Sequence, residues 1–490
     1  IHFHTDGSLN KYRVRYVVQG YTFEIDRDYY DTFAPVTQLT SIKMFMVVTL
    51  YYALPMKVYD VKGAYLNAKL DTTIWVQLPA GFTYAGCTYG KLNKAIPGVK
   101  QGAFLWWCKF RETLEATGFE IQDVEPCLFI FWKNNITCIL LIHTDNIVVS
   151  CNNFPWWEST CSKWDFKTLQ VDSKSILGVQ IERTGPYSCT FCQPQYIDDL
   201  IKEFGLEDRK PTHVPLRHGI ENDYNPDEMS RLVDTSIPFR SLCMKLYWVA
   251  RSFRSHIMYA CNFFARFNHC YTRELFEEML DTALYLKGTR MWKLVFEIDP
   301  SKPLEPVFAC DANFSNTTTQ PSSFGCLGWV QSCLVYAQSS TIKTAVTSSC
   351  ESESHAIFEA CKAAVFIRNW ILAFCEVKLP MFVFNDNTSA IAILGVRTNN
   401  TLSKHFAPKL RYVTYLVEKG LIRLFHIPRG MNGADILTHS LGRRKFEDLL
   451  VVVYGRAGLQ GLIDVAARSS EGGDLDFQDP YSTLTIIIID

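Results

Sequence analysis

The stretch TCILLIHTDNIVVS, residues 137–150, determines the first part of the fold. Two apolar runs rich in β-branched residues flank the polar tetrapeptide HTDN, which is typical of a β-hairpin with that tetrapeptide at its tip. Upstream, MKVYD predicts a strand that ends at Asp60, and Asp145 stands at the predicted tip. Carboxylates that adjacent strands aim at one point suit hard cations such as Mg²⁺, so Asp60 and Asp145 are candidate metal ligands. The alternative for each is a structural Asp at a strand end or turn.

Strands and helices alternate around this hairpin. RVRYVVQGY (13–21) alternates basic and apolar residues like a half-buried strand, whereas TSIKMFMVVTLYYAL (40–54) has helical apolar spacing. From about Pro215 onward the pattern is helical. The predicted helices are FRSLCMKLYWVARSF (239–253), SHIMYACNFFARFNH (255–269) and LFEEMLDTALYLKG (275–288). IDPSKPLEP (298–306) then predicts a linker, because proline interrupts both helices and strands.

The second half predicts an α/β layered domain, because strands and helices follow one another at short spacings. A long helix is expected over residues 348–375, with Ser348 or Ser349 as its N-cap, and a short closing helix over residues 433–441. The expected strands are PVFACDANFS (306–315), FGCLGWVQSCLVYAQ (324–338), MFVFNDNTSAIAIL (381–394) and LIRLFHIP (421–428).

Acidic residues follow strand ends and helix starts in this domain. They are Asp311, Glu353, Asp386 and Asp435. Strand C-termini and helix N-termini often face the same way in α/β layers, so the carboxylates are expected to converge. Crowded carboxylates repel one another unless cations bind, which predicts a two-Mg²⁺ centre able to activate water against a phosphodiester. Alternatively, Glu351 and Glu353 complement the helix dipole and Asp435 caps a helix.

Composition limits the class of protein. The 490 residues suffice for about three domains, and a 48% hydrophobic and 20% charged composition excludes a disordered or fibrous chain. The net charge of -1 points away from nucleic acid, but residues 403–445 are locally basic and suit the phosphates of a duplex, or else a solvated helix face. The cations of that stretch are Lys404, Lys409, Arg411, Lys419, Arg423, Arg429, Arg443, Arg444 and Lys445.

Cysteine usage predicts a reduced compartment. The 17 cysteines are scattered and no secretory leader opens the sequence, so an intracellular location, cytoplasm or nucleus, is expected rather than secretion. Cys189 and Cys192 lack a second pair at zinc spacing, which favours plain strand residues over a metal site. No apolar run reaches the roughly 18–20 residues that span a bilayer, so no membrane partner is expected.

An ordered series of motifs between residues 12 and 289 resembles the reverse transcriptase of copia-type LTR retrotransposon polyproteins. The motifs are YRVR (12–15), VQGYT (18–22), DTFAPV (31–36), DVKGAYLN (60–67), PAGF (79–82), GVKQ (98–101), LG (177–178), QPQYI (193–197) and YLKGT (285–289). Later motifs resemble the RNase H domain of the same polyproteins. These are CDAN (310–313), SSCESE (348–353), DN-x-SA (386–390) and ADILT (434–438).

The resemblance implies a role for each candidate residue of the polymerase. Asp60 and Asp145 fall on the metal-binding aspartates, and Tyr65 falls where an aromatic ring crowds the sugar 2′ position. Arg13 and Arg15 lie where cations meet the incoming triphosphate. Lys100 and Gln101 belong to a motif beside the template–nucleotide pocket and are taken as substrate-binding.

The resemblance also implies cofactors and partners. The RNase H acids are Asp311, Glu353, Asp386 and Asp435, and both centres use pairs of Mg²⁺ ions. The implied partners are an RNA template, a DNA primer, RNA–DNA hybrid and deoxynucleoside triphosphates.

Departures from the family pattern predict impaired synthesis beside a retained nuclease site. The family hairpin carries Tyr-x-Asp-Asp, whereas Asn146 supplies no negative charge here. Losing a unit charge at such a site costs several kcal/mol of transition-state stabilisation. The family motif at 96–103 is also altered, and Pro97 removes a backbone donor. A nucleic-acid-binding protein without catalysis and a non-functional element relic remain alternatives.

The expected fold class is α/β and α+β multidomain, a right-hand polymerase with fingers, palm and thumb followed by an RNase H-like α/β domain. The expected domains are fingers and palm, lacking part of the family's N-terminal region, at 1–215, a helical thumb or connection at 216–290, a linker at 291–305, the RNase H-like domain at 306–450 and a disordered tail at 451–490.

Overall fold

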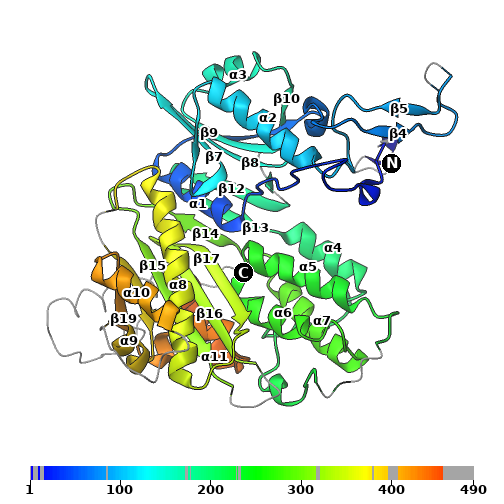
Figure 1. Cartoon of the computed structure of the whole chain (residues 1–490). Coiled ribbons are helices and arrows are strands. Elements are labelled where there is room, and N and C mark those ends of the chain that lie inside the picture. Colours follow the sequence, from blue (N-terminus) through cyan, green and yellow to red (C-terminus); the bar gives the residue numbers. More distant parts are fainter. Residues whose placement is uncertain are drawn as a thin grey trace. The chain divides into compact units, whose positions relative to one another are not determined.

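The computed structural model divides into two compact units (Figure 1). One comprises residues 1–45 and 54–173, and the other residues 46–53 and 174–490. The finer domain division expected from the sequence stays a prediction. The structure describes residues 2–3, 9–11, 16–83, 86–171, 175–176, 178–227, 229, 233–315, 321–377, 380–395 and 407–455.

An antiparallel six-stranded sheet in the order β10-β3-β9-β8-β7-β6 forms the centre of the first unit. Its strands are β3 (Met56–Val61), β6 (Glu120–Gln122), β7 (Glu125–Lys133), β8 (Ile136–His143), β9 (Asn146–Cys151) and β10 (Thr168–Val171). β8 and β9 form the hairpin expected from the sequence, which is confirmed. The register of β3 against β9 sets Asp60 opposite Asn146.

Helices α2 (Gly102–Ala116) and α3 (Phe154–Cys161) belong to the same unit as this sheet. Helix α1 (Leu39–Tyr51), which confirms the helix expected at 40–54, is divided between the two units after Phe45. Phe110 of α2 packs edge-on against Phe129 of β7, with ring centroids 6.0 Å apart. Both side chains are fully buried, so this contact belongs to the core that fixes α2 on the sheet. Two short antiparallel pairs lie outside the sheet. They are β1 (His2–Phe3) with β2 (Leu9–Lys11) and β4 (Trp75–Gln77) with β5 (Tyr89–Lys91).

The strand expected at 13–21 is wrong over its described part, residues 16–21, while residues 13–15 lie outside the described residues. Gly20 begins a 3₁₀ turn, η1 (Gly20–Thr22), and Val18 N–H donates to Pro97 O at 2.9 Å. A Cβ at Gly20 would lie 2.0 Å from Gly98 O, so the backbone at Gly20 passes very close to the backbone at Gly98. Its alternating pattern therefore reflects packing against a loop and not pairing with a strand.

The second unit begins with a four-stranded sheet and a helical block. The sheet has the order β11 (Ser175–Ile176), β12 (Val179–Gly185), β13 (Ser188–Cys192), β14 (Leu294–Glu297). β14 lies inside the range expected as a linker, and Cys189 and Cys192 lie in strand β13. The helices are α4 (Pro194–Glu203), α5 (Phe239–Ser252), α6 (Met258–Ala265) and α7 (Arg273–Gly288), which confirms the helical pattern.

A five-stranded sheet in the order β17-β16-β15-β18-β19 follows. Its strands are β15 (Pro306–Asn313), β16 (Ser323–Val330), β17 (Cys333–Thr341), β18 (Met381–Asn385) and β19 (Ile422–His426). The first three are antiparallel, whereas β18 and β19 run parallel to β15. Helix α8 (Ser349–Leu372) packs against β15 and β16 (Figure 1). Helices α9 (Thr388–Gly395), α10 (Ala407–Glu418) and α11 (Arg443–Tyr454) complete the α/β layers, so the expected fold class is confirmed.

The ends of the helices differ in detail from expectation. Ser348, and not Ser349, caps α8, because its side chain accepts the Glu351 N–H. The closing helix is the 3₁₀ helix η7 (Gly433–Leu437). Helix α11 continues to Tyr454, so a tail beginning at 451 is wrong, and residues 456–490 lie outside the described residues. Within the described ranges, no helix is long and apolar enough to cross a membrane.

Candidate metal centre and polymerase-like site

Three aspartates converge at one end of the five-stranded sheet. Asp311 lies near the end of β15, Asp386 directly follows β18, and Asp435 lies in η7. Ligand oxygens from the three side chains all lie within 4.8 Å of one another. Because β15 and β18 are parallel neighbours, their carboxyl ends open at the same edge, which explains how residues so far apart in sequence meet.

Glu353 lies beside this triad, whereas Glu351 caps the helix. Asn385, the residue before Asp386, donates from Nδ2 to Glu353 Oε2 at 2.9 Å. Glu353 is only 5% exposed. The Glu351 carboxylate instead accepts the Thr347 backbone N–H at 2.8 Å, closing the first turn of α8. The structure thus groups the acids expected for the RNase H site and separates Glu351 from them.

Burial and mutual repulsion raise the pKa values of the acids in this cluster. Burial first, and then the charge of Asp435, raise the pKa of Asp311 to about 7. Burial and the charge of Asp311 raise the pKa of Glu353 to about 9. The pKa values of Asp386 and Asp435 are also raised, mainly by burial. A cation bound among these oxygens would relieve the repulsion, so the donor set fits a hard divalent ion.

Polar neighbours that the sequence did not single out hold the acids in place. Thr438 Oγ1 donates to Asp311 Oδ2 at 2.5 Å, and Lys445 Nζ lies 2.6 Å from Asp435 Oδ2. Asn385 and Asn432 each donate from Nδ2 to the carbonyl oxygen of Cys310, at 3.0 and 2.9 Å, which fixes the backbone before Asp311. Lys445, which the sequence placed among the cations expected to contact nucleic-acid phosphates, pairs with Asp435 in this structure. For Asn385 and Thr438 the available signal was their position directly after apolar residues, in MFVFN and ADILT.

These raised pKa values predict opposite effects of pH on stability and on metal binding. The unfolded carboxyls titrate near pH 4. Between that pH and the folded values of about 7 for Asp311 and about 9 for Glu353, the folded state therefore binds more protons. The metal-free free energy of unfolding should fall as pH rises through this window, because stability decreases with pH wherever the folded state holds more protons.

A divalent ion competes with those same protons, so its affinity should rise over the same window. We expect Mg²⁺ to raise the melting temperature more at about pH 8.5 than at about pH 6. Thermal melts with Mg²⁺ or with a chelator measure the difference. An equal Mg²⁺ effect at the two pH values would contradict the prediction.

The polymerase-like residues meet at the β8–β9 turn. Val61 N–H donates to Asp145 O at 2.8 Å, which ties the turn to the strand that carries Asp60. Asn146 pairs with Asp60 across the sheet, and its Nδ2 donates to Asp145 Oδ1 at 3.3 Å. A neutral amide therefore stands at position 146, where the family pattern would place a further carboxylate, opposite Asp60 in the sheet and bonded to Asp145. Among the described residues, Asp60 and Asp145 belong to no cluster of three or more possible metal ligands.

Helix α2 holds this turn, and a tyrosine faces it. Thr144 has a φ of 59°, a left-handed conformation that is costly for a β-branched residue. Trp106 Nε1 of α2 donates to Thr144 O at 2.7 Å, which supports the strained turn. Tyr65, in the 3₁₀ helix η2 (Ala64–Asn67), has a raised pKa, first from burial and then from the charge of Asp145. The charge of Asp145 thus acts on Tyr65, and the expected role of Tyr65 at the sugar 2′ position stays a prediction.

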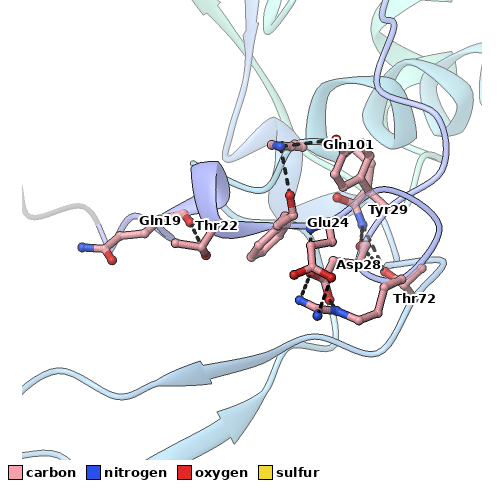
Figure 2. A network of polar contacts seen from close by, with 10 residues as sticks. Gln19, Thr22, Glu24, Asp28, Tyr29, Thr72 and Gln101 are labelled. Carbon is pink, nitrogen blue, oxygen red and sulfur yellow. Dashed lines mark hydrogen bonds and ion pairs between the residues drawn. The ribbon is translucent and has the colours of Figure 1, made fainter.

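Gln101 and Lys100 hold loops together. Gln101 is fully buried, and its Nε2 donates to Asp28 O at 2.9 Å and to Thr72 Oγ1 at 3.1 Å (Figure 2). Lys100 Nζ donates to Phe23 O at 3.1 Å and stands 4.7 Å from the centre of the Tyr29 ring. The side chain of Gln101 has no exposed surface in this structure, and the expected substrate-binding role of Gln101 and Lys100 stays a prediction.

The arginines expected to meet the triphosphate, Arg13 and Arg15, lie outside the described residues.

Known proteins match the reverse transcriptase-like part of the chain and, over longer alignments, most of its length. Residues 2–218 match the reverse transcriptase (RNA-dependent DNA polymerase) family. The retrovirus-related Pol polyprotein from transposon RE1 of Arabidopsis thaliana is 25% identical over 458 residues, covering 91% of this chain and 30% of the polyprotein. The corresponding polyprotein from transposon TNT 1-94 of Nicotiana tabacum is 26% identical over 454 residues, covering 90% and 34%.

A solved structure of foamy viral protease-reverse transcriptase in complex with RNA/DNA hybrid aligns over 81% of this chain and 46% of its own, with 11% identity and a TM-score of 0.44.

Fold and matches together resemble a Pol sequence in which a reverse transcriptase region precedes an RNase H-like α/β domain. More particularly, the chain is similar over about 90% of its length to the Pol polyproteins of copia-type retrotransposons. It spans about a third of the length of these curated relatives.

Proposed function

We propose that the acid cluster binds Mg²⁺ and cleaves the RNA strand of RNA–DNA hybrids. The observation that carries the proposal is the meeting of three aspartate side chains within 4.8 Å, with Glu353 beside them. Asp311, Asp386 and Asp435 would hold the ions, and Glu353 would complete the negative site. When bound, a pair of such ions supplies Lewis acidity and a water of lowered pKa at the scissile phosphate.

The chain's own residues would orient this chemistry. Thr438 keeps the Asp311 carboxylate in one rotamer, and Lys445 does the same for Asp435. Arg429 is 85% exposed and lies 4.0 Å from Asp386 Oδ2, where its guanidinium could contact a substrate phosphate beside the acids. Discrimination of RNA from DNA would rest on contacts to the 2′-hydroxyl in the minor groove.

For the first unit, we propose a polymerase-derived site with strongly reduced DNA synthesis. The observation that favours it is that Asn146, a neutral residue, stands opposite Asp60 in the sheet and donates to Asp145 Oδ1. An RNA template, a DNA primer and deoxynucleoside triphosphates would be the partners of this site. RNA–DNA hybrid would be the shared product and substrate of the two regions.

Hybrid cleavage by the purified chain tests the nuclease proposal. We expect cleavage of labelled RNA–DNA hybrid with Mg²⁺, none with a chelator, and none of single-stranded RNA or duplex DNA. Asp386→Asn removes one ligand charge and serves as the negative variant. Equal activity in the two proteins, or none in either, would refute the proposal. Salt-dependent hybrid binding without cleavage would favour a nucleic-acid-binding protein.

A further inference from the structure

The segment 435–441, termed here the acid loop, sets the position of much of the acid cluster. It begins with Asp435, and its Thr438 donates to Asp311 Oδ2. It leads into α11, whose Lys445 pairs with Asp435. Whatever fixes the acid loop therefore fixes two of the three aspartates relative to each other.

Residues 218–221, far away in sequence, hold the acid loop at Ser440. Ser440 N–H donates to Glu221 Oε1 at 2.7 Å, and Ser440 Oγ donates to Glu221 Oε2 at 2.6 Å. Gly219 N–H donates to Ser440 Oγ at 2.8 Å, and His218 Nδ1 lies 3.0 Å from Ser440 O. All the polar groups of Ser440 are thus engaged, and the residue is 4% exposed.

Glu221 is itself built into the helical block. It lies in the 3₁₀ helix η3 (Ile220–Asn222), and Tyr259 OH of α6 donates to its Oε1 at 2.8 Å. Burial acts to raise its pKa, but hydrogen bonds from Ser440 and Tyr259 hold that pKa below its ordinary value. The carboxylate is therefore charged at neutral pH, and the bonds that it accepts are the stronger, charge-assisted kind.

Apolar packing reinforces the same junction. Leu216 and Ala260 of the helical block line a small cavity together with Ile436, Leu441 and Phe446. The helical block and the acid loop belong to the same compact unit. Polar and apolar contacts thus act together to hold the loop.

We infer that Glu221 is a positioning residue of the acid cluster, acting through Ser440 on Thr438 and Asp435. The inference rests on the proposed function only in assigning that cluster to metal binding. It makes the centre a property of the helical block and the RNase H-like domain together, because neither sequence segment alone supplies both sides of the contact.

Mg²⁺ binding to the full chain, measured by calorimetry, tests the inference directly. Glu221→Ala removes both acceptors for Ser440, and we expect Mg²⁺ affinity to fall about tenfold, as for outer partners of other metal sites. Glu221→Gln keeps the shape and one acceptor, so an intermediate affinity is expected. Glu278→Ala is the matched control, since Glu278 pairs with Arg217 in the same block. It should leave the affinity unchanged.

Hydrogen exchange separates local positioning from general destabilisation. Peptides that cover 433–445 should exchange faster in Glu221→Ala but not in Glu278→Ala. Should Glu221→Ala fail to fold, Ser440→Ala removes only the hydroxyl contacts and should weaken Mg²⁺ binding in the same direction. A double variant should be only slightly worse than Glu221→Ala alone, because its one additional loss is the bond from Gly219 N–H to Ser440 Oγ.

The outcomes distinguish this inference from the nuclease proposal. Wild-type affinity and exchange in Glu221→Ala would overturn the inference, even if hybrid cleavage is found. A chain that binds Mg²⁺ without cleaving hybrid would overturn the nuclease proposal, while weaker binding in Glu221→Ala would still support the inference. A wild-type chain without Mg²⁺ affinity would overturn both.

Discussion

Asp311→Asn should lower hybrid cleavage by roughly three orders of magnitude and, at the same time, stabilise the metal-free protein. Removing one buried ligand charge costs about 4 kcal/mol of transition-state stabilisation, at about 1.4 kcal/mol per tenfold in rate. The pKa of Asp311, raised to about 7 by burial and by Asp435, means that its ionised form is disfavoured in the fold. Asparagine is nearly isosteric and can still accept the Thr438 hydrogen bond, so the loss of repulsion should dominate stability.

Cleavage rates at saturating Mg²⁺ and chemical denaturation with a chelator measure the two effects. At about pH 8 we expect a gain of a few kcal/mol in the free energy of unfolding. Asp448→Asn makes the same chemical change at an exposed position of α11 and should alter neither quantity. A loss of stability in Asp311→Asn would contradict the account of the cluster as a metal site, because only the replacement of a stabilising, purely structural aspartate would lower the free energy of unfolding.

Asn146→Asp should raise primer extension by about a hundredfold to a thousandfold. The new carboxylate would stand opposite Asp60 and beside Asp145 at the β8–β9 turn. A unit of negative charge at a two-metal site is worth several kcal/mol in the transition state. Without bound metal the same change should destabilise the first unit, because three carboxylates would then meet at one turn.

Extension of a DNA primer on an RNA template with Mg²⁺ measures the gain, with the unchanged chain as reference. Asn134→Asp is the matched control: it lies in the turn at the other end of β8, with a φ of 57° that an aspartate also tolerates. Absence of extension in Asn146→Asp would show that the loss of synthesis extends beyond that carboxylate. A wild-type rate equal to that of Asn146→Asp would refute the role given to the missing charge.

Local sequence patterns predicted the elements that carry the sites. The β-branched runs on both sides of HTDN allow only one short turn, so the hairpin and the position of Asp145 followed directly. The long helix at 349–372 and the strands before Asp311 and Asp386 were predicted for the same reason, because period and capping act within a few residues. The motif series also indicated which acids belong together.

Contacts between distant segments were decided by the tertiary structure alone. The alternation in RVRYVVQGY indicated a strand, but the close approach of Gly20 to Gly98 turns the chain there. Gln101 stands in a motif next to a substrate pocket, yet burial commits its amide to Asp28 and Thr72.

The hydrogen bonds from Ser440 to Glu221 join residues 219 positions apart, and no local sequence pattern predicts such a pair. The sequence by itself therefore determined the hairpin, the long helix and the identity of the acids, since these depend on neighbours along the chain, whereas Thr388–Gly395, expected as part of a strand, forms helix α9. Only the folded structure decided which polar groups are buried together, because burial and charge pairing depend on neighbours in space.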